Sequence, residues 1–127
     1  MSAAIFLEKA HEALQVAQLA LEQRCPNSAA NRAYYAAYHA TRAALVDAHV
    51  SGANEKWGHE AIQARISRLT REGKRGLPSR LGAELARLRM IRDIADYEQR
   101  MVSLRQARDV VKTATEFVSA VANVIQP

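Results

Sequence analysis

Residues 31–45 read NRAYYAAYHATRAAL and, wound into a helix, carry two contrasting faces. At 100° per residue, the apolar face and its continuation consist of Tyr34, Ala37, Thr41, Leu45 and Ala48. The opposite face mixes aromatic and basic side chains, namely Arg32, Tyr35, His39 and Arg42. The pattern predicts a long amphipathic helix over residues 28–50, with Ser28 as its N-cap.

Four further helices are predicted on either side of this one, and they are separated by short polar loops. A proline ends the first, and glycines with a proline end the third. Ser103 followed by Gln106 has the spacing of a capping box at the start of the last. Residues 51–54 and 72–78 are expected to be loops. The four expected helices span residues 3–24, 58–71, 79–97 and 103–125. The sequence therefore predicts one domain over residues 1–127, an all-α, up-and-down antiparallel bundle of about five helices.

The composition indicates in which cellular compartment the protein is expected to work. Cys25 is the only cysteine, so no internal disulfide can form. No stretch reaches 18 apolar residues, and no basic segment precedes an apolar run at the N-terminus. We therefore expect a cytoplasmic protein that has no membrane span.

Positive charge is concentrated in the middle of the sequence. The net charge is +5, and the stretch from Arg65 to Arg108 holds 12 Lys and Arg residues against 5 Asp and Glu. This distribution is typical of a phosphate- or nucleic-acid-binding surface, although a soluble surface of the ordinary kind has the same composition.

Arg92 falls within an apolar helical stripe, with Asp96 one turn further on. A charge in such a position needs a partner, because burying it alone is costly. Two interpretations remain open. Arg92 and Asp96 form an internal ion pair that fixes helix packing, or the guanidinium points into a groove and binds phosphate.

Several segments together resemble the HEPN family of small helical proteins. They are residues 31–45, the stretch Arg92-Asp93-Ile94-Ala95-Asp96-Tyr97, the stretch Gly58-His59-Glu60, and Phe117-Val118 near the C-terminus. The resemblance implies a helical bundle that forms a homodimer and works on RNA or nucleotides. It also implies partnership with a nucleotidyltransferase protein or a role in a toxin–antitoxin pair.

Many members of that family are metal-independent ribonucleases, marked by an arginine followed after four to six residues by a histidine. Here the corresponding arginine is Arg92, and Tyr97, Glu98 and Gln99 occupy the positions at that range. The histidine is therefore missing. The catalytic candidates are Arg92 for the phosphate, His39 or Tyr97 for proton transfer, and Asp96 next to Arg92.

The ligand-binding candidates are Arg32, Tyr35, Arg42 and His59. An alternative use of the aromatic–basic face is a dimer contact, because Ala36, Ala40 and Ala43 border it and small residues allow helices to approach closely. No metal-ligand spacing and no cofactor motif occurs in the sequence, so neither a metal nor a cofactor is expected.

Three functions follow from these observations. The first is a homodimeric module that binds RNA, a nucleotide or a nucleotidyltransferase. The second is a metal-independent RNA endonuclease with a rearranged site. The third is a structural interaction protein whose basic residues only maintain solubility.

Overall fold

The computed structural model describes residues 2–50, 58–73 and 75–125, and in these ranges it contains helices and no strands. This confirms the all-α prediction. The five helices are α1 (Ala3–Glu22), α2 (Pro26–Asp47), α3 (His59–Glu72), α4 (Leu81–Tyr97) and α5 (Leu104–Ile125). The expected loop at residues 51–54 lies outside the described residues, as does Lys74 in the basic loop.

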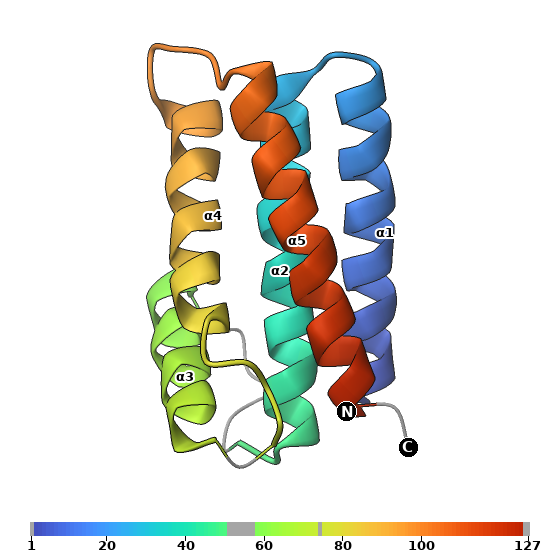
Figure 1. Cartoon of the computed structure of the whole chain (residues 1–127), viewed down its shortest axis with the longest axis vertical. Coiled ribbons are helices and arrows are strands. Elements are labelled where there is room, and N and C mark those ends of the chain that lie inside the picture. Colours follow the sequence, from blue (N-terminus) through green and yellow to red (C-terminus); the bar gives the residue numbers. More distant parts are fainter. Residues whose placement is uncertain (1, 51–57, 74, 126–127) are drawn as a thin grey trace.

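The long helices α1, α2, α4 and α5 run side by side in alternating directions, and the shorter α3 packs beside the first turns of α4 (Figure 1). Helix α2 is central, since it contacts each of the other four. A helix surrounded in this way needs small or apolar side chains on most of its circumference. The alanine-rich sequence of residues 31–45 meets that requirement.

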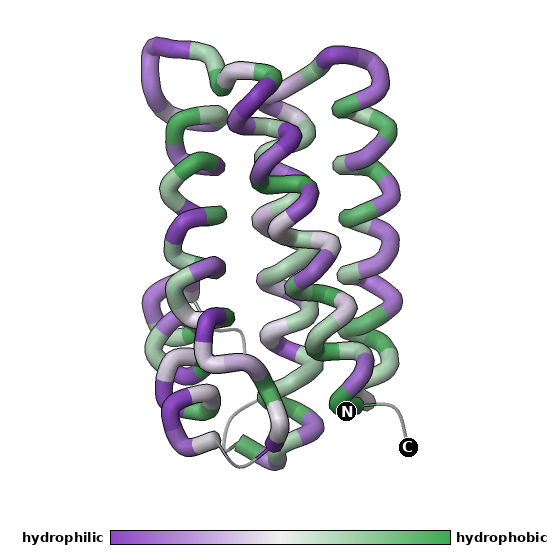
Figure 2. The backbone as a smooth tube through the Cα atoms, viewed as in Figure 1, coloured by the Kyte–Doolittle hydropathy of each residue, from purple (hydrophilic) through white to green (hydrophobic). Residues whose placement is uncertain are grey.

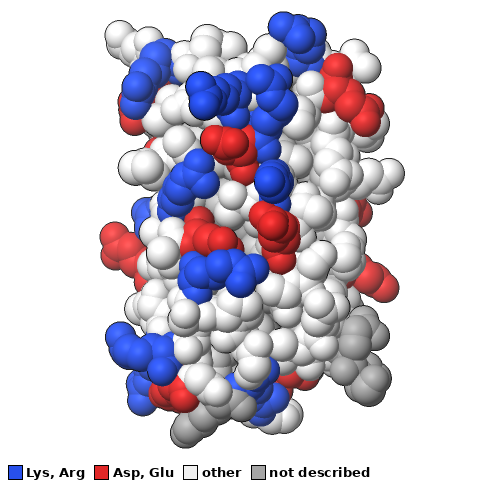
Figure 3. Space-filling model, viewed as in Figure 1, with Lys and Arg blue, Asp and Glu red and all other residues white. Residues whose placement is uncertain are grey.

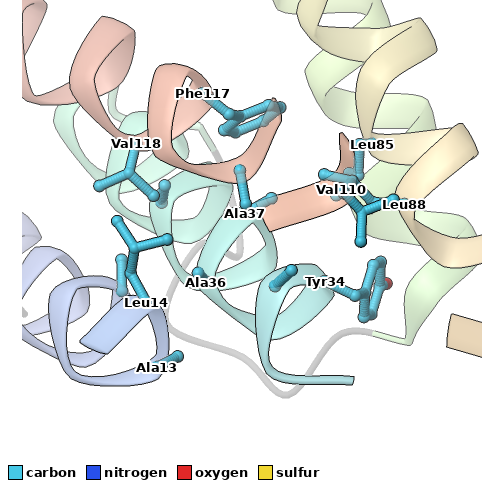
Figure 4. Close-up of a cluster of buried hydrophobic side chains, with 14 of the residues drawn as sticks. Ala13, Leu14, Tyr34, Ala36, Ala37, Leu85, Leu88, Val110, Phe117 and Val118 are labelled. Carbon is cyan, nitrogen blue, oxygen red and sulfur yellow. The ribbon is translucent and has the colours of Figure 1, made fainter. Parts of the chain in front are cut away.

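The core lies between these helices. Hydrophilic and hydrophobic residues alternate along each helix at the spacing of a helical turn (Figure 2). Tyr34 of α2 lies near Leu88 of α4 and Val110 of α5, and Phe117 lies over Ala37 (Figure 4). Tyr34 and Phe117 are the largest side chains in the fully buried set. The expected core position of Tyr34 is confirmed.

The two predicted helix starts have different outcomes. The capping box of α5 is present: Gln106 N donates to Ser103 Oγ at 3.0 Å, and Ser103 N donates to Gln106 Oε1 at 3.0 Å. The N-cap prediction for Ser28 was wrong, because α2 begins at Pro26 and its N-cap is Cys25. Proline is favoured in the first turn, where its missing N–H costs nothing, so Pro26 starts this helix as well as breaking the preceding one.

The alanine stripe of α2 also has a different role from the one predicted. Ala36, Ala40 and Ala43 are completely buried within the single chain, so they cannot border a surface through which two copies meet. Helix α2 is packed on several sides, most extensively against α1. The small size of these alanines lets neighbouring helices approach α2 closely, and the dimer prediction loses this support.

Candidate functional site

Arg92 is the centre of a polar cluster where α2, α3 and the end of α4 meet. Its side chain is only 8% exposed. Nε forms an ion pair with Asp96 Oδ2 at 2.9 Å. The Nε–H bond does not point at that oxygen, so Nε makes no hydrogen bond among the described residues. Nη1 donates to Asp93 Oδ1 at 3.3 Å. The internal ion pair, one of the two interpretations of Arg92, is therefore present.

The same guanidinium also holds two tyrosines. Nη2 donates to Tyr35 Oη at 3.0 Å and to Tyr97 Oη at 3.1 Å. Burial lowers the pKa of Arg92, but Tyr35, Tyr97, Asp96 and Asp93 raise it to a net value above its usual one. The group therefore stays charged, and its charge is directed at α2 and at the last turn of α4.

A second arginine is joined to this cluster through Asn31. Asn31 Nδ2 donates to Asp96 Oδ2 at 2.9 Å, and Arg32 Nε donates to Asn31 Oδ1 at 2.9 Å. Arg32 also lies over the Tyr35 ring, 5.1 Å from its centroid. Arg32 and Tyr35, both predicted as ligand contacts, therefore lie together and next to Arg92.

Aromatic rings surround the Arg92 guanidinium. Its Cζ lies 5.7, 5.4 and 5.2 Å from the ring centroids of Tyr34, Tyr35 and Tyr97. Tyr34 is buried, Tyr35 is half-buried, and Tyr97 is 71% exposed. One ring of the cluster is therefore open to solvent while its hydroxyl is held from within the protein.

His59, at the first position of α3, completes the cluster. Its Nδ1 lies 2.6 Å from Tyr34 Oη. Burial and then Arg92 and Arg89 lower the pKa of His59, with Asp93 opposing them, so the ring is neutral at pH 7. Burial raises the pKa of Tyr34 well above its usual range, so the phenol stays protonated. A protonated phenol and a neutral imidazole therefore share this hydrogen bond, and the tautomer of His59 sets which of the two donates.

Two other predicted site residues lie elsewhere. His39 lines a hollow between α1 and α2, with Lys9 and Arg32. Arg42 is buried over the Phe6 ring of α1, 4.7 Å from its centroid. The charges acting on His39 are those of Lys9, Arg32 and Arg42, and Arg92 is not among them. The structure does not bring His39 together with Arg92, whereas it does bring His59 there.

The sequence reasoning missed Arg89 and Asn31. Arg89 precedes Arg92 by three residues, a spacing that places both on one face of a helix, and its charge acts on both Tyr34 and His59. That spacing could have identified Arg89 before the structure. Asn31 gave no such signal, because its partner Asp96 is 65 residues away.

The profile of the HEPN domain matches residues 3–124, nearly the whole chain. The chain belongs to the HEPN domain family. No curated protein matches the sequence. The resemblance carried by residues 31–45 and 92–97 is thereby confirmed as family membership, and the work of this family is connected with nucleotides and RNA.

The basic segment of this HEPN domain is less uniformly positive in space than in sequence. Basic and acidic side chains are interspersed on the face formed by α4 and α5 (Figure 3). In the described part of the segment, arginines at six positions contact carboxylates, namely Arg68, Arg75, Arg80, Arg87, Arg92 and Arg100. These pairs offset part of the local positive excess. Arg89 and Arg32 have no carboxylate partner among the described ion pairs.

Among the described residues, no group of three or more His, Cys, Asp and Glu side chains is arranged to hold a metal ion. None of the described helices is long and apolar enough to cross a bilayer.

Proposed function

We propose that this HEPN domain is a cytoplasmic binding module for single-stranded RNA or nucleotides, and that Tyr97 and the arginines around it form the contact. The observation that carries the proposal is an exposed tyrosine held by a buried arginine. Arg92 fixes the Tyr97 hydroxyl at 3.1 Å and lies beneath the ring, whose side chain remains 71% exposed.

Such a ring is suited to stacking with a base. Stacking on an aromatic side chain is worth about 1–3 kcal/mol per base and tolerates any base, since every base has a π-face. A tyrosine already held in place loses little side-chain entropy on binding. Tyr97 therefore offers a preorganised platform.

The charged groups around Tyr97 have two different roles in this proposal. Asp93 and Asp96 largely offset Arg92, so Arg92 acts by positioning the tyrosines. Arg89 acts on the same cluster from the preceding turn of α4, and Arg32 lies over Tyr35. These two guanidinium groups supply the attraction for a phosphate that follows the stacked base.

Fluorescence anisotropy with a short labelled single-stranded RNA tests this proposal. Tyr97→Ala removes the ring and should weaken binding by about 5- to 150-fold, the equivalent of one lost stacking contact. Tyr97→Phe keeps the ring and should bind nearly as the wild type does. Leu19→Ala is the matched control, because Leu19 is also a large exposed side chain, on the outer face of α1. Equal affinity for Tyr97→Ala and the wild type would overturn the proposal.

The proposal includes a homodimer that acts as one member of a nucleotidyltransferase-associated or toxin–antitoxin pair. Family membership supports this part. Exposed apolar side chains at Met90 and Met101 add to it, since such residues are enriched in interfaces. Sedimentation velocity at micromolar concentration tests the dimer, and a monomer over the whole concentration range would contradict it.

A second candidate function is metal-independent RNA cleavage, and His59 is the observation that favours it. A neutral histidine beside Arg89 and Arg92 can accept a proton near a bound phosphate. Total RNA incubated in excess chelator should stay intact if the domain only binds. Cleavage that disappears in His59→Gln but persists in His39→Gln would replace the binding module with a nuclease.

A further inference from the structure

A cleft runs along α2 on the side of α1, and one end of it reaches the Arg92 cluster at Asn31 and Asp96. It consists of two adjoining hollows of about 470 and 270 Å³ that share Val16 and Arg32. The larger hollow extends to Asn31 and Asp96, and the smaller one to Lys9 and His39. We call the pair the α1–α2 cleft.

The charges in the smaller hollow are mainly positive. Lys9 and Arg32 both line it, and neither has a carboxylate partner among the described ion pairs. Glu12 is the acidic residue in the lining, and the buried Arg42 adds positive charge from below. A concave site with cations on two facing helices and one acid concentrates anions.

The pKa of His39 responds to these positive charges. Burial and then Lys9, Arg32 and Arg42 lower the pKa of His39 to about 4. Its Nδ1 is buried and makes no hydrogen bond in the described part of the chain. Because Nδ1 is shielded from solvent, the nitrogen that can meet an anion is Nε2, and the neutral tautomer with its hydrogen on Nε2 donates without adding charge.

We propose that Lys9, Arg32 and His39 form a phosphate subsite in the α1–α2 cleft, which binds a phosphodiester of the same RNA strand that stacks on Tyr97. The identity of the ligand rests on the proposed function. Arg32 connects the two sites, because it lines the cleft and also lies 5.1 Å over the ring of Tyr35, whose hydroxyl accepts from Arg92. A strand that passes Arg32 therefore meets the tyrosines of the Arg92 cluster in one direction and the hollow with Lys9 and His39 in the other.

The first experiment uses inorganic phosphate and follows the His39 ring by NMR through an acidic pH titration. A bound anion stabilises the imidazolium, so phosphate should raise the pKa of His39 by about 1 or more. The effect should be absent in Lys9→Gln and unchanged in Lys112→Gln, a control that removes the same charge from an exposed site on α5. A pKa of His39 that does not respond to phosphate, or that responds equally in Lys9→Gln, overturns the subsite.

The second experiment measures RNA affinity against salt concentration for the same two variants. Each phosphate contact on a single strand contributes about 0.7 to the slope of log K against log salt. The slope should therefore fall by about 0.7 in Lys9→Gln and stay at the wild-type value in Lys112→Gln. Equal slopes combined with a phosphate-dependent His39 would overturn the assignment to the RNA backbone and identify a free phosphate monoester as the occupant.

The outcomes also separate the subsite from the platform at Tyr97. RNA binding that depends on Tyr97 but not on Lys9, with His39 insensitive to phosphate, would leave the proposed function intact and remove the subsite. If the wild type does not bind RNA but the pKa of His39 responds to phosphate, the proposed function is contradicted and the anion site in the cleft remains.

Discussion

Arg92 has four polar partners, namely Tyr35, Tyr97, Asp93 and Asp96. Removing it leaves two carboxylates without their counter-ion and two tyrosine hydroxyls without a donor. We expect Arg92→Ala to lower the free energy of unfolding by about 1–3 kcal/mol, between the values for exposed and buried pairs, because Asp93 and Asp96 are partly exposed.

Urea unfolding of Arg92→Ala and Arg87→Ala measures this difference. Arg87 pairs with Asp109 at 3.7 Å, and both side chains are about half exposed, so its loss should cost little. Similar stability of the two variants would mean that the Arg92 ion pair does not stabilise the fold.

His39 should make stability depend on pH. Its pKa is about 4 in the folded protein and 6.5 in the unfolded chain, so the unfolded state binds more protons between these values. The contribution is fully present above pH 6.5 and is lost as the pH falls toward 4. The loss should be on the order of 1–2 kcal/mol, since solvent partly screens the half-buried ring.

Chemical denaturation of the wild type and of His39→Gln over this pH range isolates that contribution. The stability difference between the two proteins should change steadily through the range, in favour of the variant as the pH falls. A difference that does not vary with pH would show that the His39 ring titrates normally in the folded state.

At this scale, the sequence predicts local partners better than distant ones. The pairing of Arg92 with Asp96 follows from their spacing of four on one helix. The contact between Tyr34 and His59 does not follow from spacing, because it joins α2 to α3 and depends on how the two helices pack. For the same reason, the sequence alone does not show that His59, and not His39, lies beside Arg92.

At the scale of the elements, the starts of α2 and α5 provide a matched pair of serines. Ser103 caps α5 by accepting from Gln106 N, whereas Ser28 lies in the first turn of α2 and makes no side-chain hydrogen bond in the described part of the chain. Ser103→Ala should therefore cost about 1 kcal/mol of stability, the usual value of an N-cap. Ser28→Ala should change stability much less, and thermal unfolding of both variants measures the contrast. Equal losses would contradict the assignment of the caps.

Ala40 tests how tightly α2 is packed within the bundle. Since Ala40 is fully buried in one chain, Ala40→Leu should overpack its surroundings and cost about 1–3 kcal/mol. Ala83→Leu, at an exposed position on α4, is the control and should be nearly neutral. A stable Ala40→Leu variant with an altered oligomeric state would instead restore the alanine stripe as an interface.

The helices themselves were predictable because each segment with helical apolar periodicity is bounded by a proline, a glycine or a capping residue. Gly73, predicted within the loop after the third helix, does end α3 and has the left-handed conformation, with φ at 66°. The start of α2 was less predictable, because the proline that breaks α1 also begins the next helix. The sequence pattern shows which face is apolar but not how many neighbours a helix has, so the burial of Ala40 on the other side of α2 was missed.

At the scale of the whole molecule, charge is the property that the sequence describes least well. The positive excess between Arg65 and Arg108 is real, yet ion pairs from several helices divide it into small areas (Figure 3). The proposed binding therefore depends on where guanidinium groups meet aromatic rings, namely Arg32 over Tyr35 and Arg92 at Tyr97.

Photo-crosslinking of the whole domain to a single-stranded RNA containing 4-thiouridine, followed by tryptic digestion and mass spectrometry, tests that account most directly. Trypsin cuts after Arg92 and Arg100, so Tyr97 lies in the peptide Asp93–Arg100. We predict that this peptide carries the main crosslink and that the Tyr97→Ala variant loses it. Crosslinks confined to peptides of α3 or α5, with none in Asp93–Arg100, would contradict the central claim that Tyr97 is where this HEPN domain contacts RNA.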